Sequence, residues 1–245
     1  MEVHPHSHTE RKKWHHYFWE FFMLFLAVTL GFFVENQREH FAEHKKEIQY
    51  IRSYIEDLHT DIFQLDSLTN YCKKRNEMID SFSYLLDAPN LDLHGSDIYY
   101  YARVLTLVFP FFNNDRTIQQ LKNGGNLRLI KKQPVSNAMM DYDRQVRFIE
   151  NIHNREEEYV REYIKWLEET CDGRVFNKML VKGFGFTRPG GNPQLLKKDK
   201  QTILEFITKI HFLRSANTFM SVNYGKLKQS AQKTLAIIKQ EYHEE

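Results

Sequence analysis

A run of apolar positions extends from Tyr17 to Val34 and contains one charged residue, Glu20. As a helix that rises about 1.5 Å per residue, this run spans roughly 27 Å, close to the ~30 Å thickness of a bilayer's hydrocarbon core. We therefore predict a transmembrane helix over residues 17–35, so that the lipid bilayer is the first expected partner.

Two alternatives to a membrane anchor remain open. A cleaved signal peptide is disfavoured because the C-terminal end of the run, GFFVENQRE, has no A-x-A-like cleavage site. The run is also long for a signal peptide's apolar core. A buried helix of a soluble protein is disfavoured because FFMLFLAVTLGFFV has no polar face. The basic residues of RKK (11–13) lie closer to the run than those of its other flank, which favours a cytoplasmic N-terminus and a body outside the cytoplasm.

The same apolar pattern continues beyond the run as a heptad repeat. Alternating steps of three and four residues from Glu20 give a/d positions over more than six heptads. No Pro or Gly lies between Gly31 and Pro89, so we expect one helix from 17 to about 87 with a coiled-coil-like continuation. The predicted oligomer seam or ion path comprises Glu20, Ala27, Gly31, Val34, Phe41, Ile48, Ile51, Ile55 and Leu58. The alternative is that this helix packs within its own chain.

Glu20 is unusual because charged residues within membrane segments are costly and generally face partners or water. It is in register with Ala27, which forms a small-x-x-x-small pair with Gly31. A ring of Glu20 carboxylates in a homo-oligomer is one hypothesis. The other places Glu20 near the membrane surface, hydrated or paired with Lys13, His15 or His16.

The remaining chain is predicted to be helical, which makes the fold all-α, an extended bundle over residues 36–245. We expect helices over 97–109, over a short segment that ends at Gly124, over 134–169 and over 199–242. The Gly- and Pro-rich segment 172–194 is expected to be a surface loop, with a small hairpin or a partner-binding tip as options. Its GFGFTRPGG sequence fits neither a dinucleotide fingerprint nor a P-loop.

Composition and charge give no support for several classes of function. The formal charge of +2, from 34 basic and 32 acidic residues, gives no reason to expect a nucleic-acid partner. Cys72 and Cys171 form no C-x-x-C unit, although a single disulfide stays open for a body outside the cytoplasm. The carboxylates of Asp141, Asp143 and the REEEY cluster (155–159) are expected on exposed helix faces, where they carry no acid/base signal.

The polar segment 1–16 is rich in histidine. Its imidazoles could bind a transition metal, but an unstructured polar leader can have the same composition, so no metal or cofactor is assigned. The histidines are His4, His6, His8, His15 and His16.

Two sequence blocks resemble an uncharacterised single-span membrane protein family of Bacteroidota. The first is EIQYIRSYIEDLHTDIFQLDSL, with Glu47, Tyr50, Ile51, Tyr54, Asp57 and Leu58 at the positions of an E-x-x-Y-L-x-x-L-x-x-D-L pattern. The second matches T-x-x-x-L-x-x-x-G-x-L-x-L-I followed by a helix that ends in a tyrosine pair, at Thr117, Leu121, Gly125, Leu127, Leu129, Ile130 and Tyr142. The usual Trp of the membrane exit is absent, and Asp143 replaces the second tyrosine.

This resemblance implies a helical protein anchored in the bacterial inner membrane, and it supplies no activity. We therefore predict a non-enzymatic, homo-oligomeric structural or interaction subunit of an envelope complex, with a second envelope protein as a further partner. The alternative is an oligomeric pore with Glu20 at the helix seam. A membrane-bound enzyme would require a pocket with convergent, strongly perturbed titratable groups.

Overall fold

A computed structural model describes residues 14–183 and 185–243. About 81% of it is helical, with six α-helices and almost no strand in the described part, which confirms the all-α prediction. The chain divides into two compact units, residues 1–50 and 51–245.

The first helix, α1, extends without a break over Trp14–Leu86, 73 residues, as the absence of Pro and Gly between Gly31 and Pro89 predicted. An 18-residue window within it is long and apolar enough to cross a membrane, and none of this window is buried within the chain.

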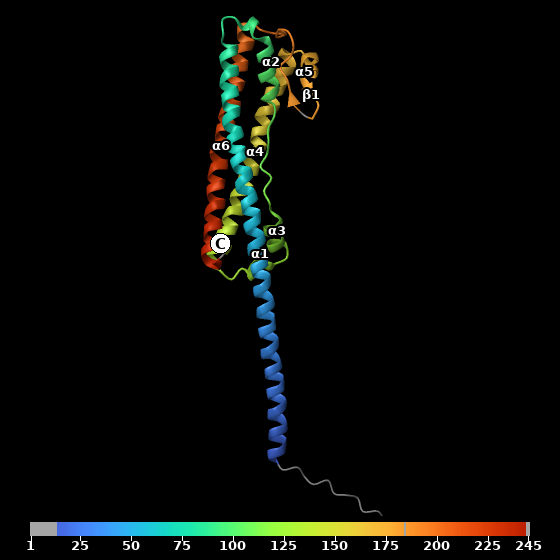
Figure 1. Cartoon of the computed structure of the whole chain (residues 1–245), viewed down its shortest axis with the longest axis vertical. Helices are drawn as coiled ribbons and strands as arrows, with labels where there is room; N and C mark the ends of the chain where they lie inside the picture. Colours follow the sequence, from blue (N-terminus) through green and yellow to red (C-terminus); the bar gives the residue numbers. More distant parts are fainter. Residues whose placement is uncertain (1–13, 184, 244–245) are drawn as a thin grey trace, which may run out of the picture. The chain divides into compact units, whose positions relative to one another are not determined.

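In the second unit, α1 from Ile51 onward packs with two further long helices, α4 (Gln133–Thr170) and α6 (Lys200–Tyr242) (Figure 1). Side-chain contacts define their directions. Asp61 and Arg75 of α1 contact Tyr142 and Glu156 of α4, so these two helices are parallel. Asp66 and Asp80 of α1 bind Lys228 and Arg214 of α6, so α6 is antiparallel to both. The predicted helices over 134–169 and 199–242 are thereby confirmed to within one residue at each end.

The connection between α1 and α4 contains two short helices, α2 (Gly95–Val104) and α3 (Arg116–Asn123). The predicted helix over 97–109 is wrong at its end, because α2 stops at Val104. The Thr106 hydroxyl donates to the Arg103 carbonyl at 2.9 Å. Tyr71 of α1 donates to the carbonyl of Leu107 at 3.0 Å, which holds the following segment extended along α1. The short helix that ends at Gly124 is confirmed as α3.

The expected loop over 172–194 is more structured than predicted. It contains α5 (Gly173–Met179) and a two-stranded antiparallel hairpin, β1 (Leu180–Val181) and β2 (Gly185–Phe186), in which Leu180 pairs with Phe186. Asp172 caps α5 by accepting from the Arg174 amide at 2.9 Å. The hairpin option is confirmed, and the segment also contains α5, which was not predicted.

The end of the body next to this hairpin has an aromatic core. The Trp166 ring of α4 and the Phe206 ring of α6 stack with centroids 3.5 Å apart, and Phe82 of α1 meets Phe206 edge-on at 5.2 Å. Tyr163 is fully buried, and its hydroxyl donates to the carbonyl of Ala102 at 2.9 Å. This core joins α2 to the three long helices.

Candidate functional site

The structure divides the predicted seam into two parts. Ile51 and Leu58 are 0% and 1% exposed in the chain's own core, and Ile55 and Ile48 are half-buried. The prediction that Ile51 and Leu58 lie at a contact between copies is therefore wrong, because other parts of the same chain already bury both residues. The exposed members are Glu20, Ala27, Gly31, Val34 and Phe41.

Glu20 lies opposite a histidine of its own helix. The His16 Nε2 and Glu20 Oε1 atoms are 3.1 Å apart, with both side chains about half exposed. This contact corresponds to the predicted alternative in which a nearby histidine pairs with Glu20. It needs no second copy of the chain.

A first polar cluster joins the two sequence blocks. Asp57 and Asp61 lie one turn apart on α1 and are 3% and 1% exposed. Asp57 accepts from the backbone amide of Thr117 at 3.2 Å. Asp61 accepts from the hydroxyl of Tyr142 and from the backbone amide of Asn114, both at 2.8 Å. Two carboxylates thus hold the chain entering α3 and the first turns of α4 against α1.

Burial dominates the titration of this cluster. It raises the pKa of Asp61, although the hydrogen bonds from Asn114 and Tyr142 oppose the shift. Burial and the neighbouring carboxylates raise the pKa of Tyr54, whose hydroxyl is buried and has no hydrogen-bond partner among the described residues. Asp61 and Tyr54 are both buried, so these two groups serve the packing of the body.

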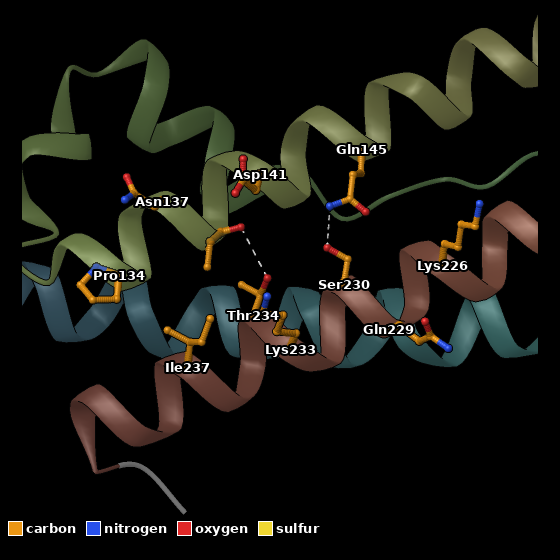
Figure 2. A pocket seen from close by; sticks show the side chains of 11 residues that line it. Pro134, Asn137, Asp141, Gln145, Lys226, Gln229, Ser230, Lys233, Thr234 and Ile237 are labelled. Atoms are coloured by element: carbon orange, nitrogen blue, oxygen red, sulfur yellow. Dashed lines mark hydrogen bonds between the residues drawn. The ribbon is translucent and has the colours of Figure 1, made fainter.

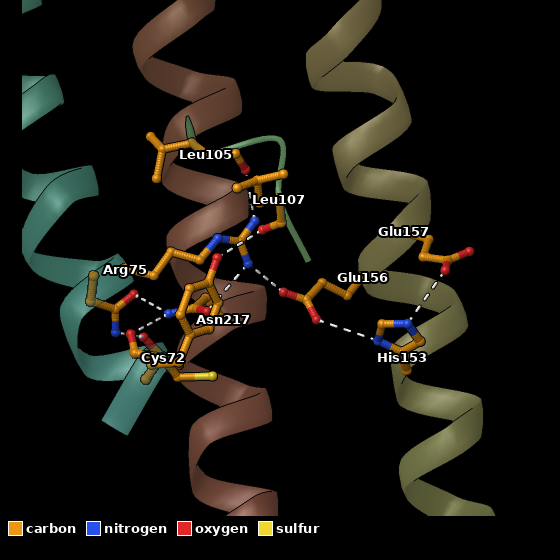
Figure 3. A network of polar contacts seen from close by, with 11 residues as sticks. Cys72, Arg75, Leu105, Leu107, His153, Glu156, Glu157 and Asn217 are labelled. Atoms are coloured by element: carbon orange, nitrogen blue, oxygen red, sulfur yellow. Dashed lines mark hydrogen bonds and ion pairs between the residues drawn. The ribbon is translucent and has the colours of Figure 1, made fainter. Parts of the chain in front are cut away.

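A second polar cluster lies two heptads along α1 (Figure 3). Arg75 is 1% exposed and its Nη1 lies 2.6 Å from Oε1 of Glu156, which is 5% exposed. Arg75 also donates to the Leu105 carbonyl at 3.0 Å and to Asn217 Oδ1 at 3.3 Å. Asn217 in turn donates to the Cys72 carbonyl at 2.7 Å. One guanidinium therefore binds α4, α6 and the end of α2 to α1.

His153 lies at the edge of this cluster, between two carboxylates. Its Nδ1 is 3.8 Å from Glu156 Oε2 and its Nε2 is 3.3 Å from Glu157 Oε1. The Glu156 carboxylate raises the pKa of His153 against the effect of burial. Burial acts to raise the pKa of Glu156, but His153 and Arg75 together outweigh it and lower that pKa.

Sequence reasoning missed these buried charges. Asp143 and Glu156 were expected on exposed faces, yet they are 7% and 5% exposed. Asp143 accepts from Lys122 at 3.1 Å and from Arg147. The spacing of apolar residues could have indicated that Glu156 is buried, because it falls on the apolar stripe that continues from Ile149 and Ile152.

Both cysteines are free and buried, so the disulfide left open by the sequence does not form. Burial raises the pKa of each thiol to about 12. These thiols are therefore packing groups in the folded body.

Two pockets between α4 and α6 are open to solvent, and we refer to them together as the groove. Its larger part has a volume of about 490 Å³ and a lining of mixed polarity, which includes Asp141, Gln145, Lys226 and Lys233 (Figure 2). A second part of about 300 Å³ is lined by aromatic rings of Tyr159, Phe212 and Phe219 together with Arg155 and Glu156. Since Glu156 also binds Arg75, this groove adjoins the second polar cluster.

No group of three or more potential metal ligands occurs among the described residues. His4, His6 and His8, and most of segment 1–16, lie outside these residues. Comparison with protein-family models, curated proteins and solved structures gives no match. The resemblance to the Bacteroidota family therefore stays a prediction.

Proposed function

We propose that this chain is a single-pass, membrane-anchored interaction subunit of a bacterial envelope complex, non-enzymatic and self-associating. Its N-terminus lies in the cytoplasm and its helical body lies on the other side of the inner membrane. The lipid bilayer, further copies of the chain and a second envelope protein are its partners.

One observation carries the proposal: the apolar window of α1 is not buried anywhere in the chain's own structure. Leu24, Phe25 and Leu30 are 71%, 55% and 59% exposed. An apolar helix of this length without a protein cover requires lipid or a partner, because exposed apolar patches of this size are rare on soluble monomers. The buried charges of Asp61, Arg75 and Glu156 are occupied by contacts between helices and hold the body together.

Membrane extraction tests the anchor. Leu24→Arg combined with Leu30→Arg places two charges in the apolar window, each costing about 3 kcal/mol at a bilayer centre. We expect the wild-type chain to resist alkaline extraction and to float with lipid, and the double variant to be released. The matched control is Phe63→Arg, at an exposed phenylalanine of the body. Release of the wild-type chain, or equal retention of the double variant, would contradict anchoring.

Orientation has a separate test. Ser67→Cys adds an exposed thiol to the body, whereas both native thiols are buried. A membrane-impermeant maleimide should label this variant in spheroplasts with an intact inner membrane. Labelling only after lysis would reverse the proposed orientation.

The pore alternative rests on Glu20. Its pairing with His16 within one helix weighs against a carboxylate ring, because the charge has a partner without a second copy. Equal conductance of liposomes with the wild-type chain and with Glu20→Gln would count against an ion path through this residue.

A further inference from the structure

The two parts of the groove between α4 and α6 lie on the same side of these helices. The lining residues recur at intervals of seven on both helices, which keeps them on one face. These residues are Ala138, Gln145, Ile152 and Tyr159 on α4, and Phe212, Phe219, Lys226 and Lys233 on α6. The two pockets therefore lie along one face of α4 and α6, with an aromatic half and a half that carries the charged residues.

The aromatic half leaves three large rings about half exposed. Tyr159, Phe212 and Phe219 are 46%, 50% and 47% exposed, and the rings of Tyr159 and Phe212 stack in parallel at 6.2 Å. With about 200 Å² for each aromatic side chain, these three residues leave roughly 300 Å² of apolar surface uncovered. A patch of this size is comparable with the largest apolar patch of a typical soluble monomer, and such patches are often functional.

The polar half carries charges of both signs. Neither Lys226 nor Lys233 has a carboxylate partner within the part of the chain that the structure describes. Asp141 pairs with Arg144 of its own helix at 2.9 Å, but its side chain stays 61% exposed and can accept a further bond. These charges lie apart along the groove and are available to another molecule.

We propose that this groove is a homodimer interface, in which a second copy of the chain docks its own α4–α6 face about a two-fold axis parallel to the helices. A two-fold contact places the same patch on both subunits, so the patch must complement itself. In this parallel arrangement each helix runs in the same direction as its counterpart in the other copy. The α4 helix of one copy then faces α6 of the other at the same height along the axis. The aromatic half then covers the aromatic half of the partner.

The charges fit this arrangement. Within one chain, Gln145 donates to Ser230 at 2.8 Å and Thr234 donates to the Ala138 carbonyl at 3.5 Å. These two contacts set the register and place Asp141 at the level of Lys233. In the parallel dimer, Asp141 of each copy therefore faces Lys233 of the other. An antiparallel dimer over the whole groove would instead place the lysines against the aromatic rings.

The size of the face is sufficient for a stable dimer. Residues 212–237 of α6 cover about 37 Å at 1.5 Å per residue, and two adjacent helices are about 20 Å wide. The face thus offers roughly 700 Å² per copy, close to the ~800 Å² per partner of a standard protein interface. The parallel arrangement also lets α1 enter both bodies at the same end, as two chains anchored in one membrane require.

This inference rests on the proposed self-associating subunit and assigns the association to the body in place of the apolar run.

The mass of the full chain in mild detergent, measured by light scattering over a dilution series, gives the dissociation constant of the dimer. We expect a dimer for the wild-type chain and at least a tenfold weaker one for Phe212→Ser with Phe219→Ser. Phe63→Ser, at a phenylalanine 76% exposed on α1, is the matched control and should leave the dimer unchanged.

Circular dichroism should show the wild-type helix content for each variant, so that a loss of dimer can be assigned to the groove. A monomeric wild-type chain would overturn the inference and would assign the groove to a different protein. A dimer that resists both groove substitutions would overturn it as well.

Mixed cysteine variants test the arrangement of the two copies. Chains with Asp141→Cys and chains with Lys233→Cys, distinguished by size tags, are mixed and oxidised. We expect a disulfide between the two kinds of chain. A mixture of Ser67→Cys and Lys233→Cys chains is the control and should form none. Equal cross-linking in both mixtures, or none in the first, would overturn the parallel arrangement.

The anchor variant separates this inference from the proposed function. Leu24→Arg with Leu30→Arg should keep the dimer, because the groove lies in the body. If this variant is monomeric while the groove variant is dimeric, association occurs through the apolar run, and the groove inference fails while the anchored subunit stands. If the wild-type chain is dimeric yet extracted from membranes, anchoring fails and the groove inference stands.

Discussion

Arg75 on α1 and Glu156 on α4 form a buried ion pair at 2.6 Å, at a sequence separation of 81 residues. The hydrogen bond from Tyr142 to Asp61 joins the same two helices with the same separation of 81 residues. The two contacts lie 14 residues apart on each helix, which is two heptads. Polar contacts thus fix the register of two parallel helices whose apolar residues alone would allow a shift by one heptad.

Glu156→Ala should destabilise the body by about 3–5 kcal/mol, because it leaves the Arg75 guanidinium buried without its counter-charge. The free energy of unfolding from denaturant titration, followed by circular dichroism, measures this loss. Arg75→Met combined with Glu156→Leu should recover much of it, since the double variant buries no charge. The control is Glu162→Ala, which removes an exposed pair with Lys165 and should change little. A loss for Glu156→Ala no larger than that of the control would show that the buried pair does not hold the bundle.

The pH dependence of stability should reflect His153 and Glu156. The pKa of His153 is raised in the folded state, so its contribution is fully present below the ordinary value of 6.5 and is lost as the pH rises through the folded pKa. The pKa of Glu156 is lowered, so its contribution is present above the ordinary value of 4.5 and is lost as the pH falls through the folded pKa. Both contributions are therefore present between about pH 4.5 and 6.5.

Denaturation midpoints at pH 5.5 and pH 8.5 test this dependence. The wild-type chain should lose more stability between these values than His153→Gln, which has no titrating ring. The difference between the two chains isolates His153, because other titrations are common to both. Equal losses would contradict a role of His153 in the cluster.

The sequence predicted the long helices well, because heptad spacing and the positions of Pro and Gly decide where such helices form and end. It could not decide what covers the apolar face of α1. Ile51 and Leu58 would show the same spacing whether a second copy or α4 of the same chain packs on them. Tertiary contacts alone distinguish the two, and they place both residues in the chain's own core.

The buried charges were harder to predict for a different reason. Glu156 lies within REEEY, where three adjacent carboxylates suggest a solvated face. Only its position on the stripe with Ile149 and Ile152 indicates burial, and its partner Arg75 is 81 residues away. The end of α2 at Val104 could not be predicted from its own sequence either. It depends on another helix, because Tyr71 and Arg75 of α1 donate to the carbonyls of Leu107 and Leu105.

Gly125→Ala should destabilise the body by about 1–2 kcal/mol, because Gly125 has φ of +63°, a left-handed conformation that costs an L-residue about this much. Gly125→Asn should lose less, since asparagine tolerates this conformation better than alanine. There is open space around the position a side chain would take, so the effect comes from the backbone alone. Denaturant midpoints of the two variants measure the difference, and an alanine variant as stable as the wild-type chain would contradict it.

Cys72 and Cys171 should react slowly with thiol reagents in the folded chain. Both are 4% exposed, and burial raises the pKa of each to about 12, so very little thiolate exists at neutral pH. A colorimetric thiol assay should find both groups only after denaturant is added. Rapid reaction of either thiol under native conditions would show that its part of the body opens locally.

Tyr54 and Tyr142 should respond in opposite ways to the loss of a hydroxyl. Tyr142 donates to Asp61, so Tyr142→Phe removes a bond to a buried carboxyl and should cost about 1–3 kcal/mol. The Tyr54 hydroxyl is buried without a partner among the described residues, so Tyr54→Phe removes an unsatisfied group and should be neutral or stabilising by up to about 1 kcal/mol. Both substitutions keep the ring, and both tyrosines lie near the carboxylate of Asp61. Each variant is therefore the control for the other in one denaturant titration. Equal destabilisation by the two would mean that Tyr54 has a hydrogen-bond partner in solution, with a buried water as the simplest candidate.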